Sequence, residues 1–159
     1  MPTPPFTEPA ALNAVAEFHH TFRLPVCERP GIPAPDRCTL RLNLLQEELD
    51  ELREAISDGD LIEVADALAD LQYVLSGAVH EFGLGARFAQ LFDEVHRSNM
   101  SKTCATETEA QATLDHYRTL GQEGRVEPSS GAFLVYRNSD NKVLKNVNYS
   151  PADVAGQLR

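Results

Sequence analysis

Long apolar runs, closely spaced cysteines and a surplus of basic residues are all absent from this sequence. No apolar stretch approaches the roughly 18 residues of a membrane-spanning helix. The first ten residues lack the basic segment and the following apolar segment of a secretory signal. The three cysteines are odd in number, scattered, and without the spacing of a metal site, which is typical of a reduced chain. We therefore expect a cytoplasmic protein that does not enter a membrane.

Basic residues are outnumbered, because 14 lysines and arginines stand against 24 aspartates and glutamates, a net charge of −10. Such a chain binds nucleic acid and anionic membranes poorly. Hydrophobic residues make up 42% and charged residues 24%, which is the range of globular proteins rather than disordered ones. A length of 159 residues supports one domain with a small core, which oligomerisation often supplements.

Hydrophobic periodicity predicts an all-α fold of about five to six helices with one small hairpin. We expect a single domain over residues 1–159 with a loose, proline-rich arm at 1–9. Two apolar runs around the turn-forming NSDN cluster predict a β-hairpin over 131–146. The expected helices are 10–23, 37–57, 60–82, 86–99, a short one from Thr106 to about 120, and a last short one near Pro151. Their expected caps are Asp36, Asp60 with Glu63, Thr106 with Glu109, and Ser150, with Gly83 ending the third helix.

The third predicted helix carries acids without accompanying bases. Asp66 and Asp70 are the only charged residues between 64 and 79, and they face away from the main apolar stripe. Burying ionised carboxylates one turn apart is costly unless a cation pairs with them. Oxygen ligands suit magnesium. That stripe, expected to be buried, consists of Leu61, Val64, Leu68, Leu71, Leu75 and Val79.

The second predicted helix supplies further carboxylates in the run QEELDELREA. Glu48 and Glu51 share one flank of its leucine stripe. Antiparallel pairing through the SDGD turn brings them toward Asp66 and Asp70, and this predicts a magnesium site. Two simpler readings stay open. Glutamates on an amphipathic helix often form a solvated face, and the capping box by itself explains Glu63.

The chain resembles the MazG-like all-α nucleoside triphosphate pyrophosphohydrolases in four segments, which are EELDE, EVADALADLQYVLSG, FDEVHRSNMSK and KVLKNVNYSPADVAGQL. That superfamily includes MazG proper, dimeric dUTPases, dCTP pyrophosphatases and phosphoribosyl-ATP pyrophosphohydrolase. The resemblance covers most of residues 11–158 and weakens over 24–36 and 104–131. It implies magnesium-dependent hydrolysis of a nucleoside triphosphate to a monophosphate and pyrophosphate, with Mn²⁺ as a substitute cation.

The family pattern EExxE on one helix and ExxD on the next assigns candidate roles. Glu47, Glu48 and Glu51 match the first half. The second half is satisfied literally by Glu63 and Asp66, whereas the ADLQYVL context favours Asp70 and places Ala67 at the glutamate position. The resemblance thus implies Glu48, Glu51, Asp66, Asp70 and Glu63 as metal ligands. It implies Glu47 and Glu48 as catalytic residues, with Glu47 orienting the attacking water.

Phosphate and base contacts follow less directly. Asn99 and Lys102 match residues that the family places near the ligand, and Arg97 lies beside them. Lys102 is also explained as a cation at a helix carboxyl end. Lys142 and Lys145 would reach phosphate on a movable hairpin, although a surface position is the simpler reading. For the base, the candidates are His19, His20 and Phe22.

Self-association is expected as well, as a homodimer or homotetramer, because Leu44, Tyr73 and Val74 lie off the main stripes of their helices. The family assembles in this way. Two alternatives remain: phosphoribosyl-ATP pyrophosphohydrolase, and a non-catalytic helical interaction module whose acids bind a regulatory cation. In neither case is nucleic acid or a membrane an expected partner.

Overall fold

The computed structural model describes residues 6–159 and divides into two compact units, one up to Phe88 and one from Ala89 to Arg159. Each unit is described by itself, and the single domain expected over 1–159 stays a prediction. Residues 6–9 of the predicted arm have no regular secondary structure, and residues 1–5 lie outside the described residues. None of the helices found between residues 6 and 159 is long and apolar enough to cross a membrane.

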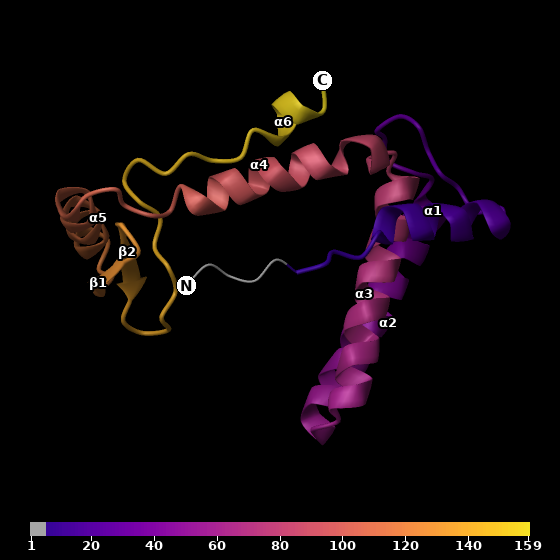
Figure 1. The fold of residues 1–159 in the computed structure, drawn as a ribbon, viewed down its shortest axis with the longest axis horizontal. Helices are drawn as coiled ribbons and strands as arrows, with labels where there is room; N and C mark the ends of the chain where they lie inside the picture. The colour runs from indigo at the N-terminus through magenta and orange to yellow at the C-terminus, as the bar shows by residue number, and fades with distance from the viewer. Residues whose placement is uncertain (1–5) are drawn as a thin grey trace. The chain divides into compact units, whose positions relative to one another are not determined.

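Helices dominate both units, and the prediction of a mainly helical chain with one small hairpin is confirmed (Figure 1). The first unit holds α1 (Ala11–Thr21), α2 (Pro35–Asp58), α3 (Leu61–Glu81) and the short 3₁₀ helix η1 (Gly85–Arg87). The second holds α4 (Phe88–Met100) from its second residue on, α5 (Glu107–Thr119), β1 (Gly124–Ser129), β2 (Ala132–Arg137) and α6 (Val154–Gln157).

In the first unit, α2 and α3 form an antiparallel helical hairpin, and α1 packs against α3 near its carboxyl end (Figure 1). Gly59 ends α2 in the left-handed region, with φ of +69°, which glycine adopts without strain. The Asp60 carboxylate caps α3, as predicted, by accepting from the N–H groups of Ile62 and Glu63. The prediction that Asp36 caps α2 is wrong, because α2 already begins at Pro35, whose fixed φ suits a first helical turn.

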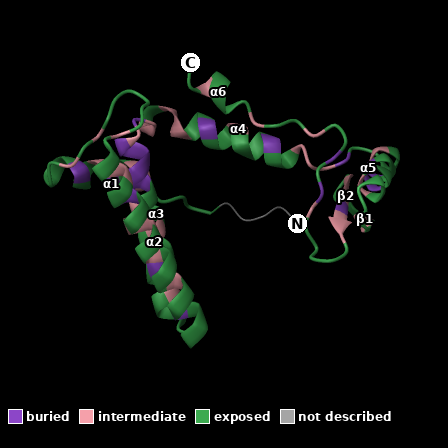
Figure 2. Cartoon of the chain, turned by 180° about the vertical axis from the view of Figure 1, so that it is seen from behind, coloured by how far each residue is buried: buried purple, intermediate pink, exposed green. Residues whose placement is uncertain are grey.

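The leucine stripe predicted to be the core of α3 is largely exposed in the chain itself. Only Val79 of that stripe is buried, whereas Leu61, Leu68 and Leu75 are exposed. The line of α3 that packs on α2 instead includes Ala67 and is buried mainly toward the α1 end, where Figure 2 shows most of the buried segments. Periodicity locates an apolar line, but it does not say whether this chain or another covers it.

In the second unit, α5 packs against the two strands. Thr106 caps α5 as predicted, because its hydroxyl accepts from the Glu109 N–H at 3.2 Å. The predicted cap at Ser150 is wrong, since α6 begins later and the Asp153 carboxylate accepts from the Gly156 N–H at 2.9 Å. The buried core consists of Cys104, Ala110, Leu114, Val135 and Leu144.

The hairpin predicted over 131–146 is confirmed in part, because β2 is its first strand and Val143, after the NSDN turn, pairs with Tyr136 in an isolated antiparallel bridge. The two-stranded sheet itself, however, is formed by β2 and the strand before it. Its strands are β1 and β2, joined by Ser130 and Gly131 with φ of +36° and +84°. Two consecutive positive φ values are typical of the tight hairpin turn that matches strand twist. The β1 strand was missed because Glu127 and Pro128 interrupt its apolar pattern.

Candidate active site

The α2–α3 hairpin positions the candidate carboxylates on one flank. Residues that recur every seven positions fall on nearly the same side of a helix, so Arg41, Glu48 and Ala55 form one line along α2. Arg41 and Ala55 are buried and Glu48 is half-buried, which shows that this line faces α3. Glu48 therefore lies between the two helices rather than on a solvated face.

The ionisation of Glu48 shows which acids surround it. Burial raises the pKa of Glu48, and the negative charges of four further carboxylates raise it more. Asp70 acts most strongly among them, as expected where α2 and α3 cross at this level. The other three are Glu51, Glu47 and Asp66. The structure thus brings together five of the predicted site residues, two from α3 and three from α2.

Glu63 stands closer to the start of α3. Its backbone N–H donates to the Asp60 carboxylate at 3.2 Å. In a full capping box, the Glu63 side chain would in turn accept from the Asp60 N–H. That N–H instead donates to the carbonyl of Ala55 at 3.0 Å. Only half of the predicted capping box is therefore present.

The carboxylates share a flank but do not converge on one point. Within residues 6–159, no three histidine, cysteine, aspartate or glutamate side chains form a ready group for a metal ion. Asp66 and Asp70 are exposed, as are Glu47 and Glu51. The donor set nevertheless consists entirely of carboxylate oxygens, the ligands that magnesium and manganese take. A cation bound here requires these side chains to turn toward Glu48.

A cavity of about 240 Å³ lies in the same unit, between α1, α2 and α3. Phe18 and Tyr73 form an edge-to-face aromatic pair beside it, with ring centroids 5.6 Å apart. Of the predicted base contacts, His19 lines the cavity, whereas Phe22 packs on Phe18 at 4.4 Å and His20 is exposed. The lining includes Leu44, Tyr73 and Val74, the three residues expected to be uncovered in a monomer.

A polar cluster that the sequence pattern does not reveal lies at this cavity. Glu81 accepts from Arg41, with Nε at 2.9 Å and Nη2 at 2.5 Å, and from Arg37, with Nε at 3.0 Å. Burial alone would raise the pKa of Glu81, but the bonds and charges of the two arginines outweigh it and lower that pKa. Gly77 makes room for the cluster, since a Cβ there would lie 2.6 Å from Arg41 Nη1. The only available signal was the spacing of Arg37 and Arg41 by one turn.

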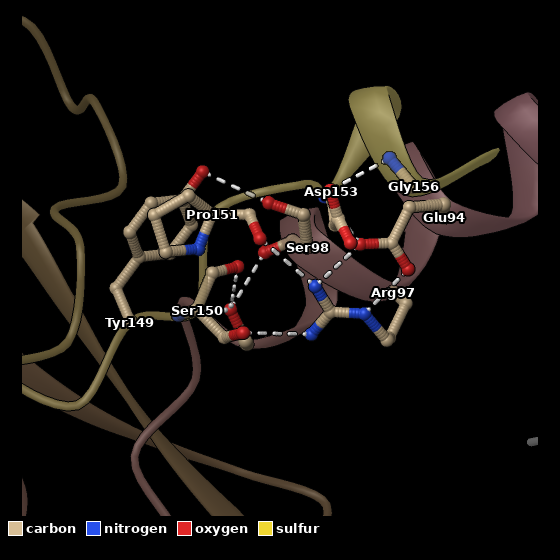
Figure 3. A network of polar contacts seen from close by, with 9 residues as sticks. Glu94, Arg97, Ser98, Tyr149, Ser150, Pro151, Asp153 and Gly156 are labelled. Atoms are coloured by element: carbon tan, nitrogen blue, oxygen red, sulfur yellow. Dashed lines mark hydrogen bonds and ion pairs between the residues drawn. The ribbon is translucent and has the colours of Figure 1, made fainter. Parts of the chain in front are cut away.

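The predicted phosphate contacts belong to the second unit, and there Arg97 has a structural role (Figure 3). Its guanidinium donates twice to Glu94 at 2.8 Å, and also to the Ser150 hydroxyl and the Pro151 carbonyl, both at 3.0 Å. Glu94 also accepts from the Asp153 N–H at 2.7 Å. These bonds fasten the C-terminal segment to α4.

The other three candidates have partners of the same unit. Lys102 donates to the Asn99 side chain at 2.7 Å. The Lys145 ammonium lies 4.5 Å from the ring centroid of Tyr149. Neither contact is strong, because both lysines are near solvent. They are therefore available to a ligand at modest cost.

The sequence model of the phosphoribosyl-ATP pyrophosphohydrolase family matches residues 15–99, more than half of the chain. The chain belongs to this family. Its members fall within the MazG-like superfamily of pyrophosphohydrolases, which are hydrolases acting on acid anhydrides. A curated relative, an uncharacterized protein of Acanthamoeba polyphaga mimivirus, is 24% identical over 225 aligned positions, covering 84% of this chain and 90% of the relative.

The bounds of the family match separate the candidate site residues into those inside and those outside the family segment. Residues 15–99 contain every candidate carboxylate together with Arg97 and Asn99, but neither Lys102 nor Lys145. This pyrophosphohydrolase thus carries its acidic flank and its cavity inside the family segment. Ala67, which one register of the sequence pattern predicts at the family's glutamate position, is 3% exposed and packs on α2. The exposed carboxylates of α3 are Glu63, Asp66 and Asp70.

Proposed function

We propose that this family member hydrolyses a nucleoside triphosphate to the monophosphate and pyrophosphate and that it requires Mg²⁺. The observation that carries the proposal is that Glu47, Glu51, Asp66 and Asp70 share one flank of α2–α3 with half-buried Glu48, whose pKa their negative charges raise. Carboxylates repel a triphosphate, so an acidic flank suits this substrate only with a cation between them. The pyrophosphohydrolase activity of the family identifies the bond that is broken as an acid anhydride bond of the substrate.

The residues divide by position. Glu48, Glu51, Asp66 and Asp70 hold the cation, and Glu63 contributes at most from outside this group. A bound magnesium neutralises charge on the phosphates and lowers the pKa of water. Glu47 lies on α2 beside Glu48 and is exposed, so it accepts the proton of the attacking water. Asn99, Lys102, Arg97 and Lys145 belong to the second unit, and their predicted contact with phosphate rests on the family resemblance alone.

Self-association belongs to the same proposal. Leu42, Leu49 and Ile56 form a line along α2, and Leu61, Leu68 and Leu75 form one along α3. These six side chains are 41% to 79% exposed. Leu49 is two residues, or 200°, from Glu51, and Leu68 is 200° from Asp70, so the apolar lines point away from the acids. A monomer seldom exposes so many large apolar side chains on two paired helices, and a second copy of the chain would cover them.

The direct test is pyrophosphate release from a panel of triphosphates and phosphoribosyl-ATP, with and without Mg²⁺ or Mn²⁺. Magnesium-dependent release from a triphosphate supports the proposal, as does a dimeric or tetrameric mass by light scattering. Phosphoribosyl-ATP is the second candidate substrate, because the matching family model carries that description. Activity on no compound would favour a non-catalytic cation-binding module.

A cellular role follows from this chemistry. Hydrolysis to a monophosphate removes a triphosphate from the pool available for incorporation, so we propose nucleotide-pool sanitising in the cytoplasm. The cysteines Cys27, Cys38 and Cys104 are free thiols, which agrees with a reducing compartment.

A further inference from the structure

Helix α1 buries few of its side chains against the rest of the first unit. Of its 11 residues only Val15 and His19 are buried, and each is 1% exposed. A helix of this length is marginal in water on its own. The packing of α1 therefore depends on a small number of contacts, and one of its two buried side chains is titratable.

The partners of His19 fix the protonation state of its ring. Nδ1 lies 2.7 Å from the Pro25 carbonyl oxygen, which only accepts, so Nδ1 carries the hydrogen. Nε2 lies 3.3 Å from Nη2 of Arg41, which only donates, so Nε2 accepts through its lone pair. A neutral ring has one donor and one acceptor nitrogen, and a charged ring has two donors. Both contacts together thus require a neutral His19.

The surroundings of His19 are unfavourable for a second proton. Burial is the largest cause that lowers its pKa, and the charges of Arg41 and His80 lower it further, whereas Glu81 opposes them. Arg37 and Arg41 share the one carboxylate of Glu81, so this cluster already has a net charge of +1. From α2 and α3, the titratable and charged side chains that act on His19 or line the cavity beside it are Arg37, Arg41, Tyr73, His80 and Glu81.

A second histidine holds α1 through a contact that acid does not break. His80 of α3 donates from Nε2 to the carbonyl of Leu12, in the first turn of α1, at 2.8 Å. Nε2 carries a hydrogen in this tautomer and keeps it when the ring is charged. The rings of His19 and His80 lie 5.8 Å apart, centroid to centroid. Of the two histidine contacts, only that between His19 and Arg41 requires a neutral ring.

The position of α1 determines what its release would change. Val15, Phe18 and His19 form the α1 wall of the cavity. The candidate carboxylates lie on α2 and α3, which pair through the short turn at Gly59. Loss of α1 would therefore open the cavity without separating the two helices that hold the acids.

We propose that α1 is an acid-sensitive element, in which a proton on His19 breaks its contact with Arg41 and releases α1 while α2 and α3 stay paired. Between the ordinary histidine pKa of about 6.5 and the lower value of packed His19, only the released chain binds this proton. The equilibrium constant for release then rises by up to about tenfold for each unit that the pH falls. Well above pH 6.5 neither state binds the proton, so α1 stays packed. This inference is independent of the proposed function, and its test requires no turnover.

The test is amide hydrogen exchange in the full-length parent protein, His19→Gln and His20→Gln at pH 7.5, 6.5 and 5.5, with each rate divided by the intrinsic rate at that pH. Glutamine keeps a donor and an acceptor but does not titrate. His20 is the matched control, because it is the next residue of the same helix and is exposed. From pH 7.5 to 5.5, protection of α1 should fall by about fivefold to tenfold in the parent and in His20→Gln. In His19→Gln it should fall by less than about twofold, and α2 should keep its protection in all three proteins.

Three outcomes would overturn the inference: protection of α1 that does not change with pH in the parent, an equal fall in His19→Gln, or a fall in α2 and α3 that accompanies the fall in α1. Should His19→Gln fail to fold, an NMR titration of the histidine rings in the parent decides instead. We expect packed His19 to stay neutral down to pH 5.5 while signals of a released α1 grow. A His19 ring that binds its proton while α1 remains packed would overturn the inference as well.

Discussion

Replacing Glu81 with glutamine should destabilise the first unit severely without touching the acidic flank. The carboxylate of Glu81 is 1% exposed and takes bonds from both Arg37 and Arg41. Glutamine keeps one acceptor oxygen but removes the charge and adds a donor that faces two guanidinium groups. Breaking a buried ion pair by removing one partner costs about 3–5 kcal/mol. Because Arg37 is 29% exposed and solvent screens it, we expect the lower end, about 3 kcal/mol.

That loss is large against the roughly 5–15 kcal/mol by which domains are stable, and corresponds to a drop in Tm of roughly 12–24 °C for a unit of this size. Urea unfolding followed by circular dichroism reports mainly on this unit, since α2 and α3 are 24 and 21 residues long. Asp50→Asn is the control, because the Asp50–Arg53 pair is exposed and worth at most about 1 kcal/mol.

The pH dependence of the free energy of unfolding is a second test of Glu81→Gln. The folded-state pKa of Glu81 lies below its ordinary value of about 4.5, so its contribution is present above pH 4.5 and is lost as pH falls through the folded value. The difference between parent and Glu81→Gln should therefore shrink in acid. A variant within about 0.5 kcal/mol of the parent at pH 7 would refute the account of this cluster.

Three further predictions concern separate parts of the molecule. Asp66→Asn should raise the Mg²⁺ concentration for half-maximal activity about tenfold or more, whereas Glu63→Gln should raise it less than about twofold. The reverse order would make Glu63 the ligand and Asp66 the outer residue. Burial lowers the pKa of His19, so below about pH 6.5 the unfolded chain binds a proton that the folded chain does not bind. The free energy of unfolding should therefore fall below about pH 6.5, and it should fall less steeply in His19→Gln. Identical pH profiles of the parent and the variant would contradict this. Hydrogen bonding from Arg97 lowers the pKa of Glu94 to about 2, so Glu94→Gln should speed hydrogen exchange at the Asp153 amide, whereas an unchanged rate would remove the fastening role.

Features that depend on neighbours in sequence were predictable. Asp60 and Thr106 cap their helices as expected, because a cap needs only a side chain and an N–H two or three residues ahead. The grouping of Glu48 with Asp70 was also accessible, since the short turn at Gly59 forces α2 and α3 to pair.

Features that depend on distant or competing partners were not predictable. The contacts of Arg37 and Arg41 with Glu81 span 44 and 40 residues, and nothing local in the sequence marks them. Ser150 looked like a helix cap, but Arg97, 53 residues away, takes its hydroxyl. The exposed line at Leu68 could not be distinguished from a core line, because both have the same period.

In the proposed function, carboxylates of α2 and α3 hold the magnesium that hydrolysis needs. The most direct measurement is pyrophosphate release from a preferred triphosphate over a Mg²⁺ titration, in the parent protein, Asp70→Asn and Asp58→Asn. Asp58 is the control, since it is an exposed acid at the end of α2 outside the carboxylate group. We expect release only with the cation, a loss of about 100-fold or more in Asp70→Asn with its helical content intact, and little change in Asp58→Asn. Magnesium-independent release, or near-parental turnover in Asp70→Asn, would contradict the assignment.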